Sequence, residues 1–209
     1  NREIFLRHLA QTSASPLALE IVKAESCKMW DKDGKEYIDL IGGISVCNVG
    51  HRHPKVIAAI KKQLDDYLHI MVYGELVQSP QVQYATLLTQ HLPASLNSVF
   101  FTASGSEATE GAMKLSKRFS GRTQIISFKN SYHGSTQGAL SVMGSEYWQQ
   151  AFRPLLPGIR QLQHNNMLQL NAIDETVACV IAETIQAEAG VLSPSKEWLT
   201  ALRKRCDEV

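Results

Sequence analysis

A run of small and hydroxyl-bearing residues, Phe101 to Glu107, has the composition of an anion-binding turn. Ser104 and Glu107 have the spacing of a capping box, which marks the first turn of a helix. Gly105 would let a ligand approach the backbone, and Ser106 adds a hydroxyl group. Because a helix N-terminus presents free N–H groups and the positive end of a dipole, this turn suits a phosphate group. A capped helix start without any ligand explains the same residues equally well, and the G-x-G-x-x-G dinucleotide motif is absent.

A second polar segment, Asn130 to Thr136, places an aromatic ring beside an imidazole. Tyr132 could stack on a planar ligand, and His133 could hydrogen-bond to one. Taken alone, the segment is explained more simply by a tyrosine that packs on the core next to a solvated histidine.

A third segment, Glu183 to Val191, carries carboxylates directly after an apolar run. A carboxylate at the end of a buried strand costs desolvation free energy unless it is paired. Glu183 and Glu188 are therefore candidate site residues, and we expect cationic partners for them. The alternative is that both are exposed loop acids.

These polar segments must be positioned by the elements that the apolar pattern predicts. We expect strands over residues 97–103, 123–128 and 177–182, and helices over residues 107–119, 136–142 and 196–206. Apolar strands that alternate with helices indicate a parallel sheet covered on both faces, so the fold class is α/β. Each polar segment follows the carboxyl end of one strand, where ligands bind in such sheets, and the three should converge on one crevice.

The first part of the chain has the pattern of a small α+β unit. Asp33-Gly34 is a hairpin signal, because glycine adopts positive φ without a steric penalty. Pro54 suits the first turn of an amphipathic helix. The sequence predicts a helix within residues 1–10, extended segments over 19–24, 28–30 and 36–40, and helices over 54–67 and 80–92.

The composition is that of a globular protein and argues against several classes of function. The formal net charge is +1, from 21 basic and 20 acidic residues, and no basic run indicates nucleic-acid binding. Apolar runs reach about six residues, against roughly 18 for a membrane span. His51 and His53 fit a turn better than a metal site. The scattered cysteines favour a reducing cytoplasm over a disulfide framework; they are Cys27, Cys47, Cys179 and Cys206.

Over essentially its whole length, the chain resembles the class III (ω-amino acid type) aminotransferases of the fold-type I pyridoxal-phosphate family. The segments that carry the resemblance are Trp30 to Asp39, Gly50 to Pro54, Ser104 to Ala108, Tyr132 to Gly134 and Glu183 to Val191. The resemblance implies a PLP-dependent transferase-like large domain, with a mainly parallel sheet between helices. Residues 1–50 would contribute to the small domain, and residues 51–209 would form the first part of the large domain.

The resemblance also implies a site for pyridoxal 5′-phosphate. Gly105 and Ser106 would bind the phosphate group. Tyr132 would stack on the pyridine ring with His133 beside it, and Glu183 would lie in the polar shell around the cofactor. The cofactor-binding residues that it implies are Ser104, Gly105, Ser106, Tyr132, His133 and Glu183.

The aspartate that keeps the pyridine nitrogen protonated and the Schiff-base lysine should lie beyond Val209. We therefore assign no catalytic residue within the chain. The last predicted element is a helix that should lead into another buried strand, so we expect the chain to be the N-terminal part of a longer protein.

Three substrate-side positions follow from the same resemblance. Glu188 would pair with a later arginine and move aside for a dicarboxylate substrate. Ser135 stands where acetylornithine, ornithine and many 4-aminobutyrate enzymes carry arginine, and Ile44 stands where ornithine aminotransferase has a tyrosine. The loop Tyr73-Gly74-Glu75 resembles one that reaches the partner subunit's site, which implies a homodimer.

The activity that the resemblance implies is a ping-pong transamination. An amino acid or ω-amine would donate the amino group, and a keto acid such as 2-oxoglutarate would accept it. Alternatives are an aminomutase of the same family, a degenerate scaffold-only relative, and a non-catalytic phosphate-binding α/β domain.

Overall fold

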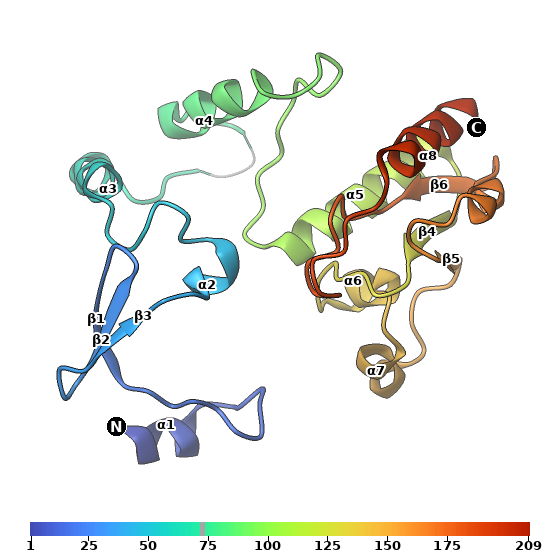
Figure 1. Cartoon of the computed structure of the whole chain (residues 1–209). Helices are drawn as coiled ribbons and strands as arrows, with labels where there is room; N and C mark the ends of the chain where they lie inside the picture. The colour runs from blue at the N-terminus through green and yellow to red at the C-terminus, as the bar shows by residue number, and fades with distance from the viewer. Residues whose placement is uncertain (72–73) are drawn as a thin grey trace. The chain divides into compact units, whose positions relative to one another are not determined.

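The computed structural model describes residues 1–71 and 74–209 (Figure 1). The chain divides into two compact units, Asn1–Val82 and Gln83–Val209. Tyr73, from the loop expected to reach a partner subunit, lies outside the described residues.

The first unit contains a three-stranded antiparallel sheet in the order β1-β2-β3. Asp31 Oδ1 accepts the backbone N–H groups of Asp33 and Lys35, at 3.0 and 2.9 Å, and Gly34 has a φ of +82°. The predicted hairpin is therefore confirmed. The elements that begin in this unit are α1 (Arg2–His8), β1 (Ile21–Glu25), β2 (Lys28–Asp31), β3 (Glu36–Ile38), α2 (Gly42–Ser45), α3 (Pro54–Asp66) and α4 (Ser79–Thr89).

His51 has a structural partner in this unit. Its Nε2 atom lies 2.6 Å from Asp39 Oδ2, while Asp39 Oδ1 accepts the N–H groups of Ile41 and Gly42. These contacts, those from the backbone amides foremost, hold the pKa of Asp39 below its usual value. The part of the chain that the structure describes contains no cluster of three or more potential metal ligands.

The second unit is built on a parallel sheet in the order β5-β4-β6, which confirms the α/β prediction. In register, Ile125 of β4 lies beside Ile159 of β5 on one side and Cys179 of β6 on the other. The elements are α5 (Gly105–Ser120), β4 (Gln124–Phe128), α6 (Gln137–Val142), α7 (Glu146–Gln149), η1 (Gln150–Phe152), β5 (Ile159–Leu162), η2 (Leu168–Ala172), β6 (Val177–Val180) and α8 (Lys196–Glu208).

The core of this unit lies on both faces of β4, because successive strand residues point to opposite sides. Ile125 packs with Met113 of α5 and Val142 of α6. Ile126 and Phe128 belong to a separate cluster that includes Trp198 and Leu202 of α8. Helices therefore cover the two faces of the sheet, as the alternating sequence pattern predicts.

The strand predicted over residues 97–103 does not form, and this prediction is wrong. A strand needs a hydrogen-bonded neighbour, and no described segment pairs with these residues. Conversely, β5 was not predicted. Its residues include Arg160 and Gln161, and among the described strands it pairs with β4 alone; an edge strand of this kind does not need the apolar run of a central strand.

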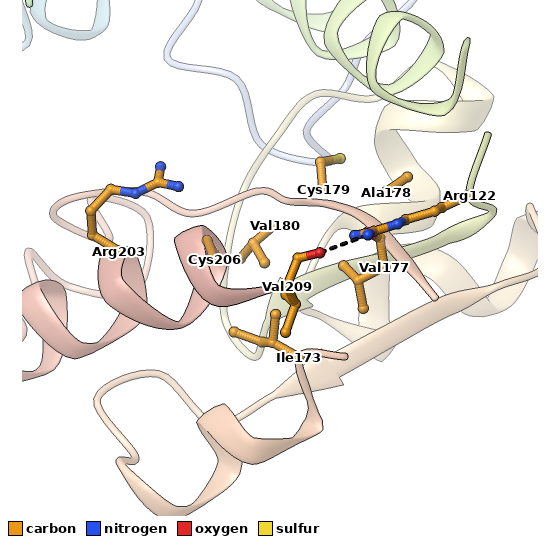
Figure 2. A pocket seen from close by; sticks show the side chains of 9 residues that line it. All are labelled: Arg122, Ile173, Val177, Ala178, Cys179, Val180, Arg203, Cys206 and Val209. Atoms are coloured by element: carbon orange, nitrogen blue, oxygen red, sulfur yellow. Dashed lines mark hydrogen bonds between the residues drawn. The ribbon is translucent and has the colours of Figure 1, made fainter. Parts of the chain in front are cut away.

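A groove of about 280 Å³ lies along β6 and the end of α8 (Figure 2). Arg122 spans it, with Nη1 donating to the Val177 carbonyl at 3.2 Å and Nη2 donating to Val209 O at 2.6 Å. Among the described strands, β6 pairs with β4 alone. No described helix is both long and apolar enough to cross a membrane.

We predict that Trp198→Ala lowers the free energy of unfolding by about 3–5 kcal/mol, because it removes a large side chain from a packed core. Trp198 is fully buried, and its ring centroid lies 5.1 Å from that of Phe128 and 5.0 Å from that of His164. Urea unfolding measures the change. Trp148→Ala is the control, since Trp148 is 57% exposed; an equal loss in both variants would contradict the assignment of the core.

Candidate active site

The turn from Thr102 to Glu107 forms the predicted capping box at the start of α5. Ser104 Oγ accepts the Glu107 N–H at 3.2 Å, and Glu107 Oε2 accepts the Ser104 N–H at 3.1 Å. Glu107 Oε2 also accepts the Ala103 N–H at 2.8 Å. Because the Glu107 carboxylate binds these amides, it acts within the cap and Ser104 fixes the first turn of the helix.

Two backbone amides at this helix start, those of Gly105 and Ser106, have no hydrogen-bond partner among the described residues. An added Cβ at Gly105 would meet no atom within 4 Å, so the side-chain position of Gly105 is open. Free amides at the N-terminus of a helix of 16 residues attract an anion through hydrogen bonding and the helix dipole. The turn thus has the geometry of a phosphate-binding site.

One face of α5 is hydrogen-bonded to the segment that follows β4. Ser106 Oγ accepts the Ser135 N–H at 3.2 Å, and Thr109 Oγ1 donates to the His133 carbonyl at 2.9 Å. Glu110 Oε1 accepts the Thr136 hydroxyl at 2.7 Å, and it also accepts the first amides of α6. Spacings of three and four residues place these α5 side chains on one side of the helix.

Gly134 is required for this close approach. A Cβ at this position would lie 2.3 Å from Ser106 Oγ and 2.9 Å from Ser106 Cα. Its φ of +118° is also a conformation that other residues rarely adopt. Gly134 therefore sets the distance between the first turn of α5 and the segment that bears Tyr132 and His133.

Glu183 connects the third polar segment to the second. Its Oε1 accepts the Tyr132 N–H at 2.9 Å, and its Oε2 accepts the Ala187 N–H at 3.2 Å. Within the described residues, backbone amides bind both oxygens of Glu183, and its expected cationic partner stays a prediction. Such charge-assisted bonds stabilise a carboxylate, and the bond from the Tyr132 amide holds the Tyr132 backbone in place.

Tyr132 and His133 differ in their surroundings. Tyr132 is 47% exposed, and its hydroxyl lies 3.3 Å from Ser135 Oγ, so its ring is available to a ligand. Burial lowers the pKa of His133 below its usual value, against the opposing effect of the Glu183 carboxylate. His133 Nε2 is buried without a hydrogen-bond partner in the described structure. The neutral imidazole is therefore the favoured form.

The remaining predicted residues lie in two places. Glu188 lines a cavity of about 480 Å³ together with Tyr132, while Ser135 lies at the start of α5 through its bond to Ser106. Ile44 belongs to the first unit, is 76% exposed and has a φ of +61°. The second unit alone therefore brings together Ser104, Gly105, Ser106, Tyr132, His133, Ser135, Glu183 and Glu188.

Several residues that shape the site were not predicted from the sequence. Thr109 and Glu110 follow Ser106 at helical spacing, and that spacing was the available signal. Gln186 is 1% exposed, and its Nε2 donates to the Lys129 carbonyl at 2.8 Å. Gln186 stands in a segment of exposed polar residues, and nothing in the sequence pattern indicates that it is buried.

The fold is shared with solved transaminases. The ornithine aminotransferase of Toxoplasma gondii ME49 matches with a TM-score of 0.85 and 26% identity, over 100% of this chain and 51% of that chain. The taurine:2-oxoglutarate aminotransferase of Bifidobacterium kashiwanohense, solved in complex with PLP and glutamate, matches with a TM-score of 0.84 and 26% identity, over 98% and 52%. The expected PLP-dependent transferase-like α/β fold is confirmed.

A family model described as aminotransferase class-III matches residues 9–209, and the chain belongs to this family. The acetylornithine aminotransferase of Methanopyrus kandleri is 40% identical over 204 residues, which cover 96% of this chain and 51% of that protein. The acetylornithine aminotransferase of Bacillus subtilis is 40% identical over 193 residues, which cover 91% and 49%. The chain spans about half the length of these curated relatives.

We predict that Gly134→Ala destabilises the protein by about 1–3 kcal/mol, because the added Cβ overlaps Ser106 and the backbone conformation is strained. Gly111→Ala, in α5, is the control: nothing lies within 4 Å of its added Cβ, and the change should stabilise the helix by about 0.5–1 kcal/mol. Denaturant unfolding of both variants tests this; a neutral Gly134→Ala would contradict the close contact.

We also predict that stability falls as the pH drops below about 6.5, the ordinary pKa of histidine. Because the folded pKa of His133 is lowered, the unfolded chain binds more protons in the window between the two pKa values. The stabilisation that neutral His133 provides is fully present above the pKa of the unfolded chain. It decreases as the pH falls toward the pKa in the folded state, by up to about 1.4 kcal/mol per pH unit. The pKa of His164 is also lowered by burial, so His133→Gln should reduce the acid-induced loss without abolishing it. An unchanged pH dependence in this variant would refute the prediction.

Proposed function

We propose that the protein containing this chain is a pyridoxal-phosphate-dependent transaminase. It would move an amino group from an amino acid or ω-amine to a keto acid such as 2-oxoglutarate. The observation that supports this best is the hydrogen-bonded connection between the α5 N-terminus and the Tyr132 segment. This connection joins the helix start with the free Gly105 and Ser106 amides to the segment that carries the half-exposed Tyr132 ring, which supports a site for a phosphorylated aromatic cofactor.

The residues fit a phosphorylated aromatic ligand. The free amides of Gly105 and Ser106 and the Ser106 hydroxyl offer three donors to a phosphate group, because Ser106 Oγ only accepts from Ser135 and its proton remains available. The half-exposed Tyr132 ring offers a stacking surface. Because the pKa of His133 is lowered, the neutral imidazole is favoured beside this ligand, and it adds no positive charge to the site.

When bound, pyridoxal phosphate supplies the electron sink for amino transfer. The described residues bind and orient it. Ser104 fixes the helix start through the capping box, and Gly105 and Ser106 bind the phosphate. Glu183 holds the Tyr132 backbone at its amide and thereby restricts where the ring can lie. The fixed amide and hydroxyl donors of Gly105 and Ser106 would keep the bound group in one orientation.

The donor side of the site lacks a guanidinium group at position 135. Ser135 Oγ is 3.3 Å from the Tyr132 hydroxyl, so two neutral hydroxyl groups occupy this place. A hydroxyl group cannot replace the bidentate hydrogen bonds of arginine to a carboxylate. We therefore propose a donor whose recognition does not require a carboxylate at this point, with Glu188 and Ile44 as further substrate-side residues.

The proposal extends to the whole protein. Residues 1–50 would contribute to its small domain and residues 51–209 to its large, cofactor-binding domain. We propose a homodimer, supported by the resemblance of the loop 73–75, and a cytoplasmic location, supported by four unpaired cysteines.

We predict that Ser106→Ala weakens the binding of pyridoxal phosphate to the full-length protein by about 10- to 100-fold, the effect of one hydrogen bond to a charged group. Visible absorbance of the protein during cofactor titration measures the affinity. Ser120→Ala, at the other end of α5, is the matched control. Pyridoxal without its phosphate should bind both variants equally. A full-length protein that stays colourless with the cofactor would reject the proposed function.

A further inference from the structure

His164, two residues beyond the end of β5, directs its ring toward the neighbouring strand β4. The ring is half-buried and lies edge-on to two fully buried aromatic side chains, with its centroid 6.0 Å from that of Phe128 and 5.0 Å from that of Trp198. Phe128 is the last residue of β4. The imidazole therefore lies at the carboxyl end of the sheet, the end at which the segments of Tyr132 and Glu183 begin.

The backbone next to His164 is fixed to the start of α8. Asn165 has a φ of +60°, and its Oδ1 accepts the Ser195 N–H at 3.0 Å. Ser195 Oγ in turn accepts the Trp198 N–H at 3.1 Å. Asparagine tolerates a positive φ better than most residues, because its short polar side chain bonds locally. The direction of the His164 side chain is thus set both by its ring contacts and by the residue that follows it.

The two nitrogen atoms of His164 distinguish it from a simple packing residue. Nε2 is buried without a hydrogen-bond partner in the described structure, and atoms of the chain already cover it. Burial lowers the pKa of His164, and a hydrogen bond to the Glu183 backbone and the Glu183 carboxylate oppose this effect. A bond that favours the protonated imidazole is one that the ring donates, so its acceptor is the Glu183 carbonyl oxygen. The donor is then Nδ1.

Glu183 lies where strand pairing no longer holds the backbone. The strand β6 ends at Val180, and the Ile181 N–H still donates to the Ile126 carbonyl at 2.8 Å. Two residues later, the Glu183 carboxylate accepts the Tyr132 N–H at 2.9 Å. The position of this carboxylate depends on whatever holds the Glu183 backbone, and a bond from His164 fixes it directly.

We propose that His164 is a positioning residue for the cofactor site: its Nδ1–H holds the Glu183 backbone, Glu183 holds the Tyr132 amide, and the Tyr132 ring is thereby fixed for stacking. The three residues follow β5, β6 and β4, so the bonds connect the carboxyl ends of all three strands of the sheet. The role in cofactor binding rests on the proposed function, whereas the contact between His164 and Glu183 does not. The competing explanation is that the ring only packs against Phe128 and Trp198.

The first test measures amide hydrogen exchange in the cofactor-free, full-length protein. His164→Phe keeps an aromatic ring and removes the donor, so exchange at the Tyr132 amide should accelerate about three- to tenfold, as for the loss of one hydrogen bond. Exchange at the Ile125 amide, which donates to the Gly158 carbonyl at 2.9 Å within the sheet, reports general destabilisation and should change less. His164→Asn places an N–H group at the position of Nδ1, and it should restore the slow exchange at Tyr132 relative to Ile125.

A double variant tests whether His164 acts through Glu183. Glu183→Ala removes the acceptor of the Tyr132 N–H and should accelerate exchange at that amide by itself. Adding His164→Phe should then cause no further acceleration there, because residues that act in one series of bonds are not additive. Additive effects, or equal acceleration at Tyr132 and Ile125 in His164→Phe, would overturn the inference in favour of a packing role.

The second test uses the protein loaded with pyridoxal phosphate. Visible circular dichroism of the bound cofactor depends on how rigidly its ring is held against neighbouring groups. His164→Phe should lose much of this signal, and His164→Asn should retain it; an unchanged signal in His164→Phe would contradict a role in the cofactor site. Because the exchange experiment needs no cofactor, failure of the inference is distinguishable from a failure of the whole protein to bind pyridoxal phosphate.

Discussion

The close contact between the first turns of α5 and the segment after β4 is the constraint on which the rest of the site depends. It requires Gly134, because any larger residue would overlap Ser106. It also requires a polar helix face, since Ser106 and Thr109 both bond to backbone groups of the facing segment. The same helix presents Met113 to the core one turn further along. A single helix therefore packs against the core through Met113 and bonds to the segment after β4 through its first turns.

The Glu110 carboxylate shows how the fold satisfies a charge inside this contact. It accepts the amides of Gly138 and Ala139, at 2.9 and 3.1 Å, at the start of α6. A negative charge is favourable there, because the unpaired amides of a helix start carry partial positive charge. Glu183 is satisfied in the same way by the amides of Tyr132 and Ala187. Bonds between these carboxylates and backbone amides thus position the site, while the Tyr132 ring stays half-exposed.

The sequence allowed the fold class, the capping box at Ser104 and the convergence of the three polar segments to be predicted, because these features depend on local spacing and strand order. It did not reveal β5, an edge strand whose polar residues do not give the pattern of a buried strand. It also predicted a strand over residues 97–103, which has no strand partner among the described residues. Contacts such as Thr109 with His133 depend on tertiary packing across 24 residues. Local patterns carry no information about a bond of that kind.

The separation of the bonded residues along the chain has a consequence for biosynthesis. The α5 contacts join residues 24 and 29 positions apart, whereas Glu183 reaches back 51 positions to the Tyr132 amide. On the ribosome, the first group of contacts can form while β6 is still unmade. The Tyr132 backbone acquires its carboxylate partner only after β6 has joined β4, a slow, non-local event in parallel sheets. A nascent chain would thus have the start of α5 in contact with the segment after β4 before the Tyr132 backbone is fixed.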